Sequence, residues 1–209
     1  MGARGPGTAR EEILARIAAA AVPPARAPRP QAAIREGSTV MLAERIAEYR
    51  ATVVECTDAD LADVLAELLA ETVHLVVPSG LPPEWLDRCS MDAVADSPKH
   101  PLTAAELDRP GTSVLTGCAV AIARTGTVVL DGGPGQGRRL LTLVPDHHIC
   151  LVRPGQTVDD VPDALAALPD PARPLTFVSG PSATSDIELR RIEGVHGPRR
   201  LNVVIMGDR

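Results

Sequence analysis

The sequence predicts an α/β protein, because short apolar runs of strand character alternate with amphipathic segments of helical period from residue 38 onward. Residues 51–56 and 74–77 are two such runs, and residues 58–70 between them read as a helix capped by Asp58. Strands that alternate with helices favour a parallel or mixed sheet covered by helices on both faces.

The remaining elements follow the same alternation. We expect further helices over 40–49, 84–88 and 103–107, and further strands over 114–115, 119–123, 128–130, 149–152, 175–178 and 201–206. Residues 1–37 are expected to form an N-terminal helix over 8–21 and a Pro-rich linker, and residues 38–209 the α/β domain. The first helix either packs on a partner subunit or remains a solvated tail.

Composition narrows the classes of function. Aromatic residues make up only 1% of the chain, so the core must be built from aliphatic side chains, and stacking of nucleic-acid bases is disfavoured. A net charge of −6 also disfavours binding to a phosphate backbone. No apolar run is long enough to span a membrane, and charged residues interrupt the first helix where a signal peptide would be apolar. We therefore expect a cytoplasmic protein with no nucleic-acid partner and no membrane span.

Cysteine and histidine spacing indicates no metal centre. Cys56, Cys89, Cys118 and Cys150 form no CxxC pair, whereas iron–sulfur and structural zinc sites use clustered thiolates. His147 and His148 are neighbours on an expected strand, so their side chains point to opposite faces and cannot chelate one ion together. We expect no metal and no cofactor bound by this chain.

The glycine-rich segment 131–139 invites a phosphate-loop interpretation. It lacks the Gly-Lys-Ser/Thr ending of a P-loop, and its glycines do not have the dinucleotide-binding spacing. We interpret it as a flexible connection between strands.

The most informative chemistry lies in residues 179–200, called here the C-terminal motif. After an expected strand, Ser182, Thr184 and Ser185 place three hydroxyls within four residues, and Ser185 has capping-box spacing to Glu188. A helix N-terminus beside hydroxyls is a plausible anion site, and His196 follows between two glycines. Alternatively, Ser185 and its neighbours only cap a helix and the histidine satisfies a buried carbonyl.

These residues carry a resemblance. Gly180-Pro-Ser-Ala-Thr-Ser-Asp-Ile-Glu188 and Gly194-Val-His-Gly-Pro-Arg-Arg200 resemble the signature of the lactate-utilization (LUD) domain family, in particular its small members without iron–sulfur motifs. Ala123-Arg-Thr-Gly-Thr127 and Leu143-Val-Pro145 match two earlier blocks. The resemblance implies a Rossmann-like three-layer α/β domain of the superfamily of ribose-5-phosphate isomerase, glucosamine-6-phosphate deaminase and the CoA-transferases.

The same resemblance implies where a ligand binds. The cleft would lie at strand carboxyl ends, between neighbouring strands 175–178 and 201–206 and near the Thr-Gly-Thr turn. The candidate binding residues are Thr125, Gly126, Gly180, Ser182, Thr184, Asp186, Glu188, His196, Gly197 and Arg199. An arginine here offers the planar fork that recognises carboxylates. No catalytic residue is assigned.

Three functions remain open. By resemblance, the chain is a lactate-utilization subunit that binds a small carboxylate or assists assembly, while iron–sulfur partner subunits carry the electrons from L-lactate to pyruvate. Alternatively, it is a stand-alone isomerase, deaminase or acyl-CoA transferase on a small anionic substrate. That chemistry needs a placed carboxylate, and Arg124 stands where relatives often have Glu. In the third, the C-terminal motif is only a subunit interface.

Overall fold

A computed structural model describes residues 9–20, 33–170, 172–184, 192–193 and 197–207, and the side chains of 183–184 and 192–193 are not described. The chain divides into two units, residues 1–30 and 31–209, which are treated separately. In the first unit, helix α1 (Ala9–Ala20) has no buried residue, and Ile13, Leu14 and Ile17 are exposed.

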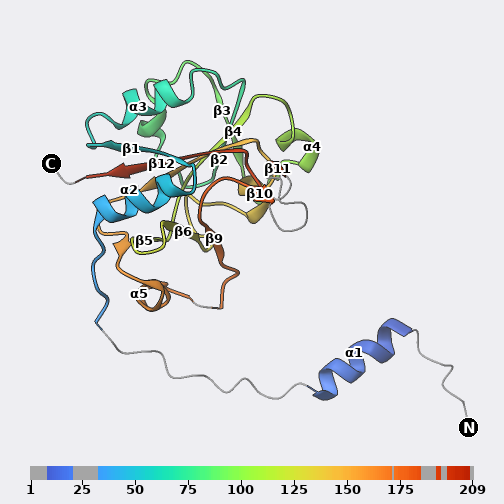
Figure 1. The fold of residues 1–209 in the computed structure, drawn as a ribbon. Helices are drawn as coiled ribbons and strands as arrows, with labels where there is room; N and C mark the ends of the chain where they lie inside the picture. The colour runs from blue at the N-terminus through green and yellow to red at the C-terminus, as the bar shows by residue number, and fades with distance from the viewer. Residues whose placement is uncertain (1–8, 21–32, 171, 185–191, 194–196, 208–209) are drawn as a thin grey trace, which may run out of the picture. The chain divides into compact units, whose positions relative to one another are not determined.

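A six-stranded sheet is the frame of the second unit (Figure 1). All of its strand pairs are parallel. Its strands in spatial order are β1 (Thr52–Cys56), β12 (Arg200–Met206), β7 (His147–Val152), β4 (Thr112–Gly117), β2 (His74–Pro78) and β3 (Ala93–Asp96). The central strand β7 is buried along its whole length, as expected for a parallel strand covered on both faces.

Helices cover both faces of this sheet, which confirms the predicted α/β class. On one face, α3 (Leu61–Leu68) and the 3-10 turn η1 (Pro83–Leu86) pack Leu65 and Trp85 against Ile149 and Leu151 of β7. The alternate β7 residues, Cys150 and Val152, point to the opposite face, where they join the core under α2 (Thr39–Glu48). Helix α4 (Ala104–Leu107) and the 3-10 turn η2 (Arg139–Thr142) complete that face.

A second sheet was not anticipated from the sequence. It contains β8 (Thr157–Val158), β5 (Val120–Ile122), β6 (Thr127–Leu130) and β9 (Thr176–Val178), and α5 (Val161–Ala167) packs on it. The expectation that the strands on either side of the C-terminal motif are neighbours is therefore wrong. Strand β9 pairs with β6 in this sheet, whereas β12 pairs with β1 and β7 in the larger one. Within the motif, β10 (Ala183–Thr184) and β11 (Ile192–Glu193) form an antiparallel pair.

The start of α3 also differs from the prediction. The helix begins at Leu61, after Asp60, and not at Asp58. The Thr57 hydroxyl donates to the Asp60 carboxylate at 2.6 Å, and the Asp60 N–H donates to the Thr57 carbonyl at 3.2 Å. This turn uses the residues that would otherwise form the first helical turn.

Residues 35–37, which the sequence analysis placed before the α/β domain, bond to β8, α5 and the residues that join them. The Arg35 guanidinium lies 2.8 Å from Asp159 and 2.9 Å from Asp163, and the Gly37 N–H donates to the Thr157 carbonyl.

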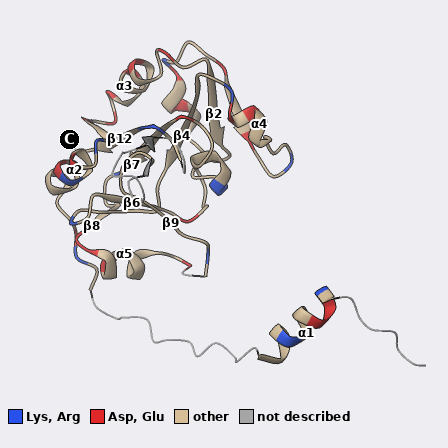
Figure 2. Cartoon of the chain, turned by 45° about the vertical axis from the view of Figure 1, so that its right-hand side comes forward, with Lys and Arg blue, Asp and Glu red and all other residues tan. Residues whose placement is uncertain are grey.

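Acidic residues lie on each of the helices α2, α3 and α4 (Figure 2). Among the described helices, none has both the length and the hydropathy needed to cross a bilayer.

Candidate functional site

The order of strands in the six-stranded sheet defines a crevice. After β2 the chain continues to β3 on one side, whereas after β4 it returns to the large sheet at β7 on the other side. Because β2 and β4 are adjacent, their carboxyl ends form the switch point at which open α/β sheets bind ligands. The glycine-rich segment crosses it: the Gly117 N–H donates to the Gly135 carbonyl at 2.8 Å, and the Gly135 N–H donates to the Ser79 carbonyl at 3.2 Å.

The glycine-rich segment is a loop, as predicted, but it has its own polar network. The buried Asp131 carboxylate accepts bonds from the Gly133 N–H at 2.9 Å and from the Gln136 side-chain amide at 2.8 Å. The Gln136 amide oxygen in turn accepts from the Asp131 N–H at 2.7 Å. Gly132, Gly135 and Gly137 adopt positive φ angles that a residue with a side chain rarely accepts. These bonds define a loop conformation that composition alone did not indicate.

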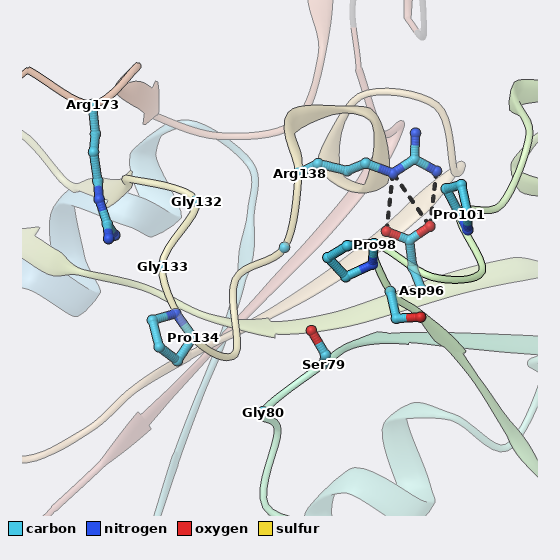
Figure 3. Close-up of a pocket in the computed structure, with 12 residues that line it drawn as sticks. Ser79, Gly80, Asp96, Pro98, Pro101, Gly132, Gly133, Pro134, Arg138 and Arg173 are labelled. Carbon is cyan, nitrogen blue, oxygen red and sulfur yellow. Dashed lines mark hydrogen bonds and ion pairs between the residues drawn. The ribbon is translucent and has the colours of Figure 1, made fainter.

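The switch-point cavity is the open space beside this crevice, between the glycine-rich loop and the carboxyl ends of β2 and β3, and it has a volume of 680 Å³ (Figure 3). Arg138 and Arg173 lie on opposite sides of the Gly132–Gly133 backbone. The lining residues are Ser79, Gly80, Asp96, Ser97, Pro98, Pro101, Gly132, Gly133, Pro134, Gly137, Arg138 and Arg173.

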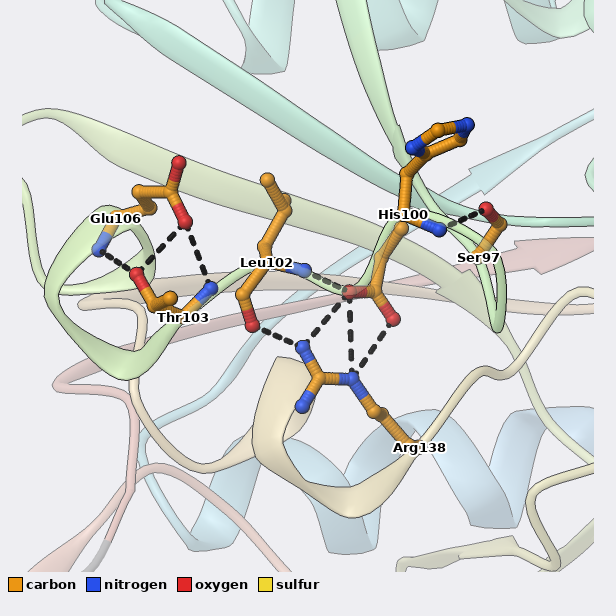
Figure 4. Close-up of polar contacts among 7 residues, drawn as sticks. Ser97, His100, Leu102, Thr103, Glu106 and Arg138 are labelled. Carbon is orange, nitrogen blue, oxygen red and sulfur yellow. Dashed lines mark hydrogen bonds and ion pairs between the residues drawn. The ribbon is translucent and has the colours of Figure 1, made fainter.

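Arg138 is fixed by a buried carboxylate (Figure 4). Its Nε lies 2.9 Å and its Nη2 2.8 Å from the two oxygens of Asp96, and Nη2 also donates to the Leu102 carbonyl. Burial opposes ionisation of Asp96, but the bonds from Arg138 and from the Leu102 N–H outweigh it and hold the pKa of Asp96 below its ordinary value. The pair ties the β3–α4 connection to the glycine-rich loop.

Arg173 is held more loosely than Arg138. Its Nη1 lies 3.4 Å from the Asp131 carboxylate and its Nε 4.0 Å from Asp170. The Arg173 side chain is 43% exposed, against 3% for Asp131.

The motif cavity is smaller, 160 Å³, and gathers three of the predicted site residues: Gly180, Ser182 and Gly197. The Ser182 N–H donates to the Pro198 carbonyl at 2.8 Å, which joins the two parts of the C-terminal motif. Arg139, which the sequence did not single out, also lines this cavity and donates to the Thr176 hydroxyl at 2.6 Å. Within the described part of the chain, no carboxylate forms an ion pair with Arg139.

A middle cavity of 510 Å³ lies between these two. It shares Arg138 and Arg173 with the switch-point cavity, and Arg139 and Thr176 with the motif cavity. The middle cavity therefore shares walls with both of the others.

The Thr-Gly-Thr turn meets the residue that precedes Gly180. Thr125 donates to the Thr127 hydroxyl at 2.8 Å, and Thr127 lies 2.7 Å from the Ser179 hydroxyl. A Cβ at Gly126 would lie 2.6 Å from the Arg45 carbonyl carbon, and one at Gly180 would lie 2.6 Å from the Tyr49 Cβ. Close packing of both loops on the end of α2 therefore explains these two glycines.

The other predicted site residues are more scattered. Arg199 is exposed and lies 3.1 Å from Asp146, and it does not line the motif cavity. Thr184 belongs to β10, and Asp186, Glu188 and His196 lie outside the described residues. Arg124 forms ion pairs with Asp159 and Asp160, both at 3.3 Å.

The two adjacent histidines of β7 bond to different partners. Ser113 lies 2.9 Å from His147 Nδ1, Asn202 lies 2.7 Å from His147 Nε2, and Thr116 lies 2.8 Å from His148 Nε2. Among the described residues, no three His, Cys, Asp or Glu side chains are placed together as metal ligands.

The fold and the cavities define the class of protein: an α/β protein with ligand-sized cavities around the switch point of a parallel sheet. The LUD domain family model matches residues 112–206, which extend from β4 to β12. Lactate utilization protein C of Deinococcus radiodurans is 50% identical over 167 residues, covering 78% of this chain and 77% of that protein. Lactate utilization protein C of an Exiguobacterium species is 30% identical over 228 residues, covering 96% of this chain and 97% of the relative.

A solved structure agrees with these relatives. The crystal structure of a DUF162 family protein from Deinococcus radiodurans has a TM-score of 0.69 and 43% identity, covering 80% of this chain and 95% of that one. The chain belongs to the LUD domain family, as its C-terminal motif indicated. Membership of the wider isomerase and CoA-transferase superfamily stays a prediction.

Proposed function

We propose that this chain takes part in lactate utilization by binding a small carboxylate in the motif cavity, while separate iron–sulfur subunits carry the electrons. The names of the relatives support the process. Scattered cysteines without a CxxC pair support the division of labour, because this chain lacks the thiolate clusters of iron–sulfur proteins.

The observation that carries the proposal is Arg139. Its guanidinium lines a 160 Å³ cavity together with the hydroxyl-bearing residues Thr142, Thr176 and Ser179, and no described carboxylate neutralises it. A guanidinium with adjacent hydroxyls matches the two oxygens of a carboxylate and the hydroxyl of a 2-hydroxy acid. Gly180, Ser182 and Gly197 complete the wall. On the resemblance of the C-terminal motif and the Thr-Gly-Thr turn to the family, and not on the cavity lining, we extend the proposed site to Thr125, Gly126, Thr184, Asp186, Glu188 and His196.

Calorimetric titration of the purified chain with L-lactate, together with growth of a deletion strain on L-lactate, tests this proposal. Removing one charge-assisted hydrogen-bonding group costs about 1.5–3 kcal/mol, which weakens binding roughly 10- to 150-fold. We expect that loss for Arg139→Gln, accompanied by slower growth on lactate.

Arg199→Gln is the matched control, because Arg199 pairs with Asp146 on the surface and does not line the cavity. Unchanged lactate affinity in Arg139→Gln would contradict the proposed carboxylate site. Normal growth of both variants, with loss of growth only when exposed motif residues are changed, would favour the interface interpretation.

A further inference from the structure

The switch-point cavity differs from the motif cavity in its volume and in its lining residues. Its volume of 680 Å³ lies in the range of about 300–1,000 Å³ typical of sites for larger organic ligands, whereas the motif cavity has 160 Å³. Pro98, Pro101 and Pro134 contribute apolar walls, and the other lining residues are four glycines, two serines, Asp96 and the two arginines. The cavity therefore has room for an apolar ring system in addition to a charged group.

Hydrogen-bond donors reach the cavity from two sides. Arg138 uses Nε and Nη2 for Asp96 and Leu102, and Nη1 has no acceptor among the described residues. Arg173 has only the long contacts to Asp131 and Asp170, so a better acceptor can displace them.

Backbone amides add to these donors. Gly80, Gly132 and Gly137 line the cavity, and their N–H groups have no protein acceptor within the described part of the chain. Backbone amides and guanidinium groups together are the donors that proteins use for phosphate, whose three oxygens accept from several directions. A carboxylate, with two oxygens in one plane, matches donors on opposite walls less well.

We propose that the switch-point cavity is a second binding site, which takes a phosphorylated organic ligand of nucleotide size. The phosphate binds at the Gly132–Gly133 backbone, which Arg138 and Arg173 flank, and the ring lies against the prolines. The buried Asp96 fixes the Arg138 guanidinium before the ligand arrives, whereas Arg173, held only by long contacts, turns from Asp131 to the phosphate. The loop needs no P-loop or dinucleotide motif for this role, because the donors come from separate strand ends.

The two sites share no lining residue, and the middle cavity shares walls with each of them. The inference does not depend on lactate binding, because no residue of the switch-point cavity belongs to the motif cavity.

Calorimetry on the purified full-length chain tests the site with adenosine 5′-monophosphate, adenosine and inorganic phosphate as probes. We expect the monophosphate to bind at least about ten-fold more tightly than either adenosine or phosphate, because it uses both the donors and the apolar walls. Arg173→Gln should weaken monophosphate binding about ten-fold or more, and Arg173→Lys should recover part of the loss because the charge remains.

Arg139→Gln is the reciprocal control, since Arg139 does not line the switch-point cavity: it should leave monophosphate binding unchanged. Lack of monophosphate binding to the parent at about 1 mM, equal affinity for inorganic phosphate, or unchanged affinity in Arg173→Gln would each overturn the inference. The thermal midpoint of Arg173→Gln, compared with that of the parent, verifies that the variant is folded. Loss of lactate binding with intact monophosphate binding would contradict only the proposed function.

Discussion

His148 makes the stability of the protein depend on pH below the ordinary histidine pKa, where the lowered pKa of His147 adds a loss of the same sign. Its side chain is 1% exposed on β7 and bonds to Thr116. Burial, with a smaller contribution from the neighbouring charge of His147, lowers the pKa of His148 from 6.5 to about 3. In the unfolded chain the imidazole takes up a proton near pH 6.5, whereas in the folded protein it stays neutral.

This difference in protonation decides whether the free energy of unfolding rises or falls with pH. Below pH 6.5 the unfolded state binds one more proton than the folded state, so the free energy of unfolding falls as pH falls, until the folded pKa is reached. The slope approaches about 1.4 kcal/mol per pH unit as the unfolded imidazole becomes fully protonated. Because that imidazole is only half protonated at pH 6.5, the loss between pH 6.5 and 4.5 is about 2.3 kcal/mol. Carboxylates with lowered pKa, such as Asp96, contribute only below about pH 4.5.

Urea unfolding at pH 6.5, 5.5 and 4.5 measures the effect. His148→Gln removes the titrating group, so its free energy of unfolding should fall by about 2.3 kcal/mol less than that of the parent over this range. His100→Gln, at an exposed histidine, is the matched control and should follow the parent. Parallel curves for the parent and His148→Gln would refute the reasoning, even if the variant is less stable throughout.

Four further predictions concern the packing of Gly126, the Arg138–Asp96 ion pair, the N-terminal segment and the metal and flavin content of the protein. Gly126→Ala should destabilise the fold by about 2–4 kcal/mol in urea unfolding, because it adds both strain and a clash with α2, whereas Gly155→Ala, with a positive φ but open space, should cost only about 1 kcal/mol. Arg138→Leu should cost about 1–3 kcal/mol in the same assay, since it leaves the Asp96 carboxylate buried and unpaired; no loss would show that solvent replaces the pair. A chain lacking residues 1–30 should keep a cooperative thermal transition within a few degrees of the parent, because the contacts divide the chain there, and insolubility would contradict this. The purified protein should contain no stoichiometric iron or zinc and no flavin absorption, as elemental analysis and a visible spectrum would establish.

The sequence predicted the frame of the fold because apolar periodicity depends directly on burial. The apolar runs of β7 and β12 and the helical period of α2 are strong sequence patterns, and the structure has these three elements where they were expected. Assignment of strands to sheets was not predictable in the same way. A three-residue strand such as β9 has the same pattern in either sheet, and only tertiary packing, such as that of Val178 against the core under α2, decides its partner.

The site was predicted in part. The C-terminal motif identified Gly180, Ser182 and Gly197, which do surround one cavity. Arg138, Arg139 and Arg173 were missed, because their roles depend on residues more than thirty positions away, such as Asp96 and Thr176. The available signal was the pair of arginines that ends the glycine-rich segment, but composition could not show that this segment crosses a switch point.

The scarcity of aromatic residues gives this protein a built-in optical probe. Trp85 is the single tryptophan of the chain, and it is 9% exposed where η1 packs on α3 and β7. Its indole emission therefore comes from one known position in the core, on the sheet face opposite α2. Unfolding of that face shifts the whole tryptophan signal at once, so fluorescence can follow it separately from events under α2, where Tyr49 lies at the helix end.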